Sequence, residues 1–177
     1  MIKIIERPLP CFNDRPDTAE INVVIVHAMH ADEFPGAELD PQACWEQLKS
    51  KQVAAHYLIA QSGEIWRLVG EEKRAWHAGE SQMPAHLTGA AGVNDFSIGV
   101  ELVGYETQEY TAAQYQSFAE LTADILKRHP LRAILGHEHI AIPAGRKTDP
   151  GPFFSWPRYR EALHRLGVDT EEICFGD

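Results

Sequence analysis

Histidines and a carboxylate with the chemistry of metal ligands stand where two predicted strands end. His27 ends the β-branched run 21–27, and His137 ends the run 132–137. Asp149 follows in a loop stiffened by prolines and glycines. Two neutral imidazoles and a carboxylate, with one position left for water, form the donor set of a catalytic zinc site. The pattern therefore indicates metal-assisted hydrolysis. The alternative is that each histidine is an ordinary polar residue at a strand end.

Two nearby histidines are less clearly placed. His139 lies two residues after His137, so either could supply the second imidazole. His137 directly ends the strand and follows Gly136, which favours it. His30 follows His27 by three residues. Because a strand that runs into a loop sends two such side chains apart, we expect His30 to be exposed and outside the site.

Two other side chains could complete a hydrolytic mechanism. Lys147 stands two residues before Asp149, where its ammonium could stabilise the oxyanion of a tetrahedral intermediate. Glu101 lies among apolar neighbours in IGVELVG. Burial raises the pKa of a carboxyl group, which suits a general base that takes a proton from water. The alternatives are a solvated loop lysine and an ion pair between Glu101 and an arginine.

Other reactive groups are less well supported. Trp76 in AWHAG (75–79) suits a wall that stacks on a sugar or a peptide, although a half-buried core tryptophan is equally common. The sequence contains no GxSxG motif, and no cysteine has a context that would activate it. A phosphate-binding glycine loop is also absent from the sequence.

Strands and helices alternate along the chain without strict βαβ regularity, which predicts an α/β fold with a central mixed β-sheet flanked by helices. Asp40 and Pro41 open one predicted helix, and Thr111 with Gln114 forms a capping-box pattern at another. The predicted strands are 21–27, 53–60, 64–70, 96–104 and 132–137, with 53–60 and 64–70 as a hairpin. The predicted helices are 40–50, 111–129 and 157–166. The stretches 28–39 and 77–95 are predicted to be site-forming loops.

Composition limits the class of protein. The 177 residues suit one domain, 1–177, with a core of about 21–166 and a short polar C-terminal tail. The net charge of -10 and the absence of clustered basic residues argue against nucleic acid and anionic membranes as partners. The sequence shows neither a signal peptide nor a transmembrane run, and its three cysteines are scattered, so we expect a cytoplasmic protein.

Five blocks taken together resemble one enzyme family. They are VIVH (24–27), AAHYLIAQSGEIWRLV (54–69), RAWHAG (74–79), NDFSIGVEL (94–102) and GRKTDPGPFFSW (145–156). In this order they resemble the zinc-dependent type 2 N-acetylmuramoyl-L-alanine amidases, a family that includes T7 lysozyme-type amidases and peptidoglycan recognition proteins. The similarity is strongest to the AmpD-like amidases, which act on anhydro-muropeptides. It covers about residues 21–160.

The resemblance implies a site and an activity. One Zn²⁺ would be bound by His27, His137 and Asp149. Glu101 would be the general base and Lys147 the residue that stabilises the transition state. Trp76 and Arg146 would line the substrate groove. The implied reaction is hydrolysis of the amide between the lactyl group of (anhydro-)N-acetylmuramic acid and L-alanine in a peptidoglycan fragment. Separately from the resemblance, we expect the protein to be a monomer.

The sequence departs from the AmpD-like pattern at several positions. Ala28 stands where these relatives commonly have asparagine, while Gln52 and Gly92 replace arginines thought to hold the carboxylates of the peptide. His139 stands where an aspartate is usual, and two residues are added before Arg146. His139 thereby keeps the usual ten-residue spacing to Asp149, so the choice between the histidines stays open. The departures leave two alternatives: a phage-type or exported lysin that acts on intact peptidoglycan, and a non-catalytic peptidoglycan-binding module.

Overall fold

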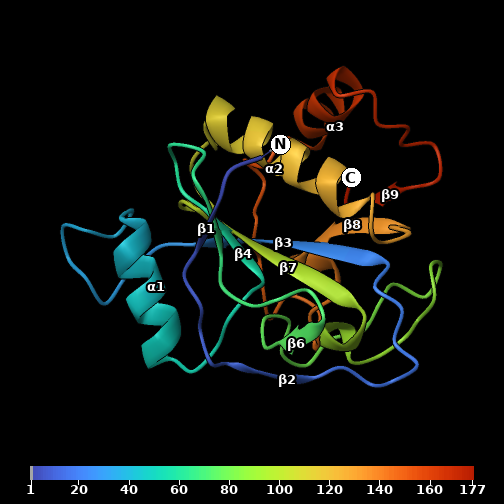
Figure 1. Cartoon of the computed structure of the whole chain (residues 1–177), viewed down its shortest axis with the longest axis horizontal. Helices are drawn as coiled ribbons and strands as arrows, with labels where there is room; N and C mark the ends of the chain where they lie inside the picture. Colours follow the sequence, from blue (N-terminus) through green and yellow to red (C-terminus); the bar gives the residue numbers. More distant parts are fainter. Residues whose placement is uncertain (1) are drawn as a thin grey trace.

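A seven-stranded sheet with both parallel and antiparallel pairs forms the centre of the computed structural model, which describes residues 2–177 (Figure 1). The strand order is β1-β5-β4-β7-β3-β8-β9. Only β4 and β5 pair antiparallel in this sheet. The strands are β1 (Ile4–Glu6), β3 (Val23–Met29), β4 (Tyr57–Ile59), β5 (Ile65–Arg67), β7 (Ser97–Val103), β8 (Ala133–Gly136) and β9 (Cys174–Phe175). A separate antiparallel pair joins β2 (Phe12–Asp14) to β6 (Lys73–Ala75).

Three α-helices cover the sheet, which confirms the predicted fold class. They are α1 (Pro41–Ser50), α2 (Ala112–Ile125) and α3 (Trp156–Arg165). The predicted capping groups are in place: Asp40 accepts a hydrogen bond from the amide of Gln42, and Thr111 and Gln114 form a reciprocal capping box. Helix α2 ends four residues earlier than predicted, because residues 126–129 form a hydrogen-bonded turn.

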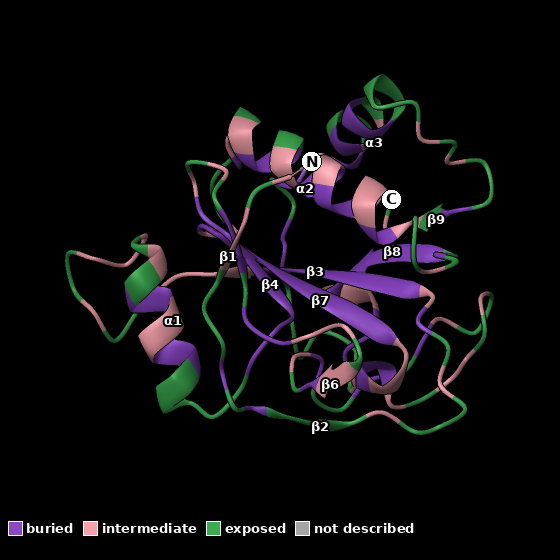
Figure 2. Ribbon diagram, in the orientation of Figure 1, coloured by how far each residue is buried: buried purple, intermediate pink, exposed green. Residues whose placement is uncertain are grey.

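The two faces of the sheet carry different layers. Helices α2 and α3 lie together over one face, and α1 packs on the other (Figure 1). Along β3, Val24 and Val26 belong to the core under α2 and α3, whereas Val23 and Ile25 pack on the opposite face. His27 shares this second face because side chains alternate along a strand. The central strands are buried along nearly their whole length (Figure 2).

Both ends of the described chain extend the sheet beyond the predicted core of about 21–166. β1 pairs with β5 at one edge and β9 pairs with β8 at the other, so the C-terminal segment is not simply a polar tail. Phe175 of β9 packs its ring against Tyr159 of α3, with ring centroids 6.1 Å apart. Strands of two or three residues carry no periodicity, which is why the sequence pattern missed them.

No helix within residues 2–177 is long and apolar enough to cross a membrane.

Candidate metal centre and active site

Three buried side chains converge on the face of the sheet that carries α1. His27 lies in β3, His137 is the first residue after β8, in the short 3-10 helix η2 (His137–His139), and Asp149 comes from the following loop. The Nδ1 atoms of His27 and His137 are 3.1 Å apart. Oδ2 of Asp149 lies 3.0 Å from Nδ1 of His27 and 3.2 Å from Nδ1 of His137. Three donor atoms therefore face one point.

The donor atoms have the spacing of ligands around one small cation. Ligands of a tetrahedral ion with bonds of 2.0–2.1 Å lie about 3.3 Å from one another, close to the separations seen here. Two imidazole nitrogens and a carboxylate oxygen are suitable donors for a divalent metal of this size. His27, His137 and Asp149 are thus a group that could hold a metal ion.

His139 lies outside this group. Its Nδ1 accepts a hydrogen bond from the amide of Gly136 at 2.9 Å, and its ring lies beside Trp156 with centroids 6.1 Å apart. The structure therefore brings His137, and not His139, to His27 and Asp149. Residues 143–148, which lie between His139 and Asp149, are exposed, and within them the amide of Arg146 donates to the carbonyl of Pro143 at 3.0 Å. An exposed turn of this kind has room for the two residues that are added before Arg146.

Glu101 lies next to the group. It is the partner of His27 in the β3–β7 register, so the two side chains share one face of the sheet. Its Oε2 is buried and has no hydrogen-bond partner among the described residues. Burial, and after it the negative charge of Asp149, raise the pKa of Glu101 to about 8, although the positive charge of Lys147 opposes them. Within residues 2–177 no arginine pairs with Glu101, so the ion-pair alternative does not hold.

Asp149 is held in its ionised form. Burial by itself would raise the pKa of this carboxyl group, but hydrogen bonds with His137 and His27 outweigh burial and hold the pKa far below its ordinary value. Burial lowers the pKa of His27, which favours the neutral ring. Metal binding requires the charged carboxylate and imidazole nitrogens that carry no proton, so a bound metal would take the place of the hydrogen bonds that the histidines donate to Asp149.

A groove of about 640 Å³ opens over these residues. His27, Glu101, His137 and Asp149 line it together with Lys147, Trp76 and Arg146. Lys147 is exposed and makes no hydrogen bond or ion pair within residues 2–177. This fits both a solvated loop lysine and a lysine whose ammonium group is free to contact a bound substrate. Trp76 is 38% exposed, and its indole N–H donates to Oδ1 of Asn13 at 2.8 Å. It is therefore a partly exposed wall of the groove rather than a core residue.

Arg146 is more constrained than the sequence indicated. Its Nε donates to the carbonyl of Ile142 at 2.8 Å, and its Nη2 donates to the carbonyls of Glu80 and Ala78 at 2.7 and 3.2 Å. These bonds tie the loop of residues 142–149 to the segment after β6. Only Nη1 makes no hydrogen bond to the described part of the chain.

The three positions 28, 52 and 92, which depart from the AmpD-like pattern, lie in different parts of the structure. Ala28 lines the groove. Gln52 is exposed just beyond α1, with a positive φ of 54°, and Gly92 precedes the 3-10 helix η1 (Val93–Asp95) with a φ of 70°.

His30 is half-buried against Tyr105, with ring centroids 4.5 Å apart, so the expectation that it is exposed was wrong. Met29 pairs with Val103 at the ends of β3 and β7, which places His30 near Tyr105, a contact that depends on strand pairing and that no local pattern predicts.

Sequence reasoning missed the residues behind the ligands. Nε2 of His27 lies 3.0 Å from Nδ1 of His77, and Nε2 of His137 lies 3.0 Å from the carbonyl oxygen of Ala78. The available signal was the proximity of His77 to the groove residue Trp76 in the RAWHAG block. His77 and Asn94 also line the groove, as the predicted site-forming loop 77–95 suggested.

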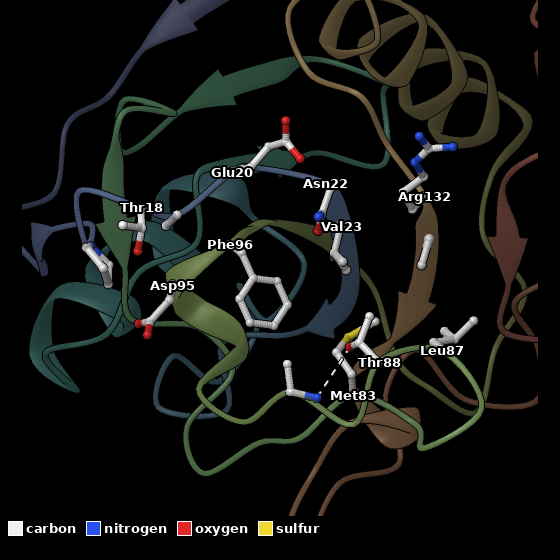
Figure 3. Close-up of a pocket in the computed structure, with 14 residues that line it drawn as sticks. Thr18, Glu20, Asn22, Val23, Met83, Leu87, Thr88, Asp95, Phe96 and Arg132 are labelled. Atoms are coloured by element: carbon white, nitrogen blue, oxygen red, sulfur yellow. Dashed lines mark hydrogen bonds between the residues drawn. The ribbon is translucent and has the colours of Figure 1, made fainter.

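A second cavity, of about 610 Å³, lies near the amino ends of β3, β7 and β8 (Figure 3). Phe96 points into it, and Glu20, Asn22 and Arg132 stand around it in the close-up. Arg132 already pairs with Glu172 at 3.0 Å. The only metal-ligand group found in the described chain is in the groove, not in this cavity.

Comparison with known proteins agrees with the site. Residues 17–152 match the family model described as N-acetylmuramoyl-L-alanine amidase. The 1,6-anhydro-N-acetylmuramyl-L-alanine amidase AmpD of Salmonella typhimurium is 39% identical over 176 residues, which cover 93% of this chain and 91% of that protein.

Solved structures give the same result. A crystal structure of a selenomethionine AmpD derivative aligns with a TM-score of 0.76 and 37% identity, and covers 92% of this chain and 96% of that one. The Escherichia coli amidase AmiD, in complex with the substrate anhydro-N-acetylmuramic acid-L-Ala-D-gamma-Glu-L-Lys, aligns with a TM-score of 0.68 and 32% identity. That alignment covers 84% of this chain and 60% of AmiD. The chain therefore belongs to the N-acetylmuramoyl-L-alanine amidase family of hydrolases.

Proposed function

We propose that this amidase uses Zn²⁺ to hydrolyse the amide between the lactyl group of (anhydro-)N-acetylmuramic acid and L-alanine in peptidoglycan fragments. The observation that carries the proposal is the convergence of His27, His137 and Asp149 beside the unpartnered carboxyl group of Glu101. Zinc suits a donor set of two imidazoles and one carboxylate. The substrate class is supported by the AmiD complex with anhydro-N-acetylmuramic acid-L-Ala-D-gamma-Glu-L-Lys.

His27, His137 and Asp149 would hold the metal. When bound, zinc supplies a Lewis acid that polarises the scissile carbonyl and acidifies water. Glu101 takes a proton from the attacking water at its free Oε2 and returns it to the leaving nitrogen of L-alanine. A pKa of about 8 lets this carboxyl group hold the proton between the two steps.

The exposed wall of the groove contributes charge and shape. Lys147 lies close enough to Glu101 for its charge to lower the pKa of that carboxyl group, so its ammonium also acts on charge that develops at the carbonyl oxygen. Trp76 offers a partly exposed ring to the sugar or the peptide. Arg146 offers Nη1 to a polar group of the substrate while its other nitrogens hold the loop.

Every residue in this scheme comes from one chain and one groove. This supports residues 1–177 as a single amidase domain and a monomer as the active unit. The non-catalytic alternative is disfavoured because the ligand group, Glu101 and Lys147 all line the same groove.

The test uses two substrates, a soluble anhydro-muropeptide and intact sacculi, each with and without a chelator. Mass spectrometry should detect free stem peptide with an intact L-alanine amino terminus. Chelation should abolish its release, and added zinc should restore it. Cleavage of sacculi but not of the soluble fragment would identify a lysin. Failure of the folded, zinc-loaded protein to cleave either substrate would refute the proposal.

A further inference from the structure

Two consecutive residues contact the outer nitrogens of both histidine ligands. His27 directs Nδ1 to the metal group and Nε2 to Nδ1 of His77, at 3.0 Å. His137 directs Nδ1 to the same group and donates from Nε2 to the carbonyl oxygen of Ala78, at 3.0 Å. The segment after β6 is therefore a common support for two ligands that come from different strands.

The contacts of His77 allow only two arrangements of protons. Its Nε2 lies 3.1 Å from Oγ of Ser97, which makes a chain from His27 through His77 to Ser97. In the first arrangement His77 donates from its Nδ1, and Nε2 of His27 accepts. The proton of a neutral His27 would then be on the Nδ1 of His27, and that nitrogen could not bind a metal. If His27 donates from Nε2, His77 accepts at Nδ1 and donates from Nε2 to Ser97, and Nδ1 of His27 is free for a metal.

The His77 ring and its backbone are held firmly. Oδ1 of Asn94 accepts hydrogen bonds from the amides of His77 and Ala78, at 3.2 and 2.9 Å. The ring lies against β7 at Gly99, where a Cβ would come within 2.5 Å of Cγ of His77. Only glycine at position 99 leaves room for the ring in this place. A side chain fixed on both sides in this way can fix the orientation of another.

We propose that His77 is a positioning residue that sets the tautomer and the orientation of the metal ligand His27, while the carbonyl group of Ala78 does the same for His137. The inference rests on the metal-binding role assigned to His27 under the proposed function. His77 acts through His27 and takes no part in the bond-making steps. In metal sites, loss of an outer partner of this kind typically weakens metal affinity by about 10–100-fold.

Three variants separate positioning from folding. His77→Leu fills much of the space but removes the acceptor for Nε2 of His27. His77→Asn keeps an acceptor, because Oδ1 of asparagine lies near the place of Nδ1. The matched control is His56→Leu. His56 is fully buried, and its ring centroid lies 5.7 Å from that of His77. Its side chain makes hydrogen bonds with the amide of Gly99 and the carbonyl of Lys73 and contacts none of the metal ligands.

The readouts are zinc affinity, by competition with a chromogenic chelator, and the visible spectrum of the cobalt-loaded protein. We expect His77→Leu to bind zinc about 10–100-fold more weakly and to shift the cobalt bands, and His77→Asn to recover most of the affinity. His56→Leu should lower the melting temperature and leave zinc affinity unchanged. Wild-type affinity in folded His77→Leu, or an equal loss in His56→Leu, would overturn the positioning role. A wild-type protein that binds no zinc would instead refute the proposed function as well.

A measurement on the zinc-loaded wild-type protein keeps the inference testable if His77→Leu does not fold. In ¹⁵N spectra of labelled histidine, His77 should carry its proton on Nε2, and Nδ1 should show no directly bonded proton. A proton on Nδ1 of His77 would reverse the chain to His27 and overturn the proposal.

Discussion

Replacing Glu101 by glutamine should stabilise the metal-free protein, and the gain should grow with pH. The neutral amide has nearly the shape of the protonated carboxyl group and removes only the ability to ionise. In the folded protein the pKa of Glu101 is raised by burial to about 8, against an ordinary value of 4.5. The unfolded chain therefore releases this proton at a lower pH than the folded chain, and wild-type stability falls as the pH rises between the two values.

The size of the effect follows from the two pKa values at about 1.4 kcal/mol per pKa unit. At about pH 4 both states hold the proton, so wild type and Glu101→Gln should differ little. At pH 7 the unfolded wild type has gained about 3 kcal/mol from ionisation that the folded protein cannot match. Above about pH 9 the difference should level off near 5 kcal/mol.

The assay is urea unfolding of both proteins in the presence of a chelator at several pH values. Glu106→Gln is the matched control, because it removes a carboxylate from the half-buried rim of the same groove. A difference between Glu101→Gln and wild type that stays constant from pH 4 to pH 9 would refute the assignment of a buried carboxyl group with a raised pKa. With zinc restored, the same variant should bind metal and yet lose most of its hydrolytic rate.

Four further substitutions test three separate parts of the structure. Lys147→Ala should lower kcat by about a hundredfold or more while zinc content, measured by metal analysis, stays the same; normal turnover would remove Lys147 from the mechanism. His137→Ala should lose zinc on dialysis whereas His139→Ala should retain it, and the opposite result would show that the second ligand is His139. Phe118→Ala should lower the free energy of unfolding by about 3–5 kcal/mol in chemical denaturation, because the buried Phe118 ring stacks on Tyr159 with centroids 4.4 Å apart. A loss below about 1 kcal/mol, well under the range for a buried phenylalanine, would contradict that packing.

The sequence was most informative where local chemistry and local structure agree. Asp40 with Pro41 and Thr111 with Gln114 mark the starts of α1 and α2 without reference to the rest of the chain. The β-branched run ending at His27 predicts a buried strand for the same reason. By contrast, the edge strands β1 and β9 exist only because β5 and β8 offer unpaired edges. Pairing of that kind depends on tertiary structure, and no periodicity within two or three residues reveals it.

The residues of the site also divide into those that local sequence predicts and those that only the folded structure places. The types of His27, Glu101 and Asp149 suggested zinc hydrolysis, but spacing alone left His137 and His139 unresolved. The register resolves where each lies: β8 aligns Gly136 with Val26, so the next residue, His137, reaches the level of His27, while His139 has turned away in η2. The same parallel pairing sets Glu101 opposite His27.

The placement of these groups explains how one site holds one carboxyl group with a lowered pKa and another with a raised pKa. Asp149 enters from a loop and accepts hydrogen bonds from two imidazoles, so its pKa falls despite burial. Glu101 points from the middle of a buried strand with one oxygen unpartnered, so its charge is unmatched and its pKa rises. Strand register places Glu101 beside His27, the loop after η2 brings Asp149 to the same groove, and the different partners of the two carboxyl groups separate their roles. A ligand that keeps its charge and a carboxyl group that can take up a proton and pass it on are the two behaviours that hydrolysis by metal-activated water requires.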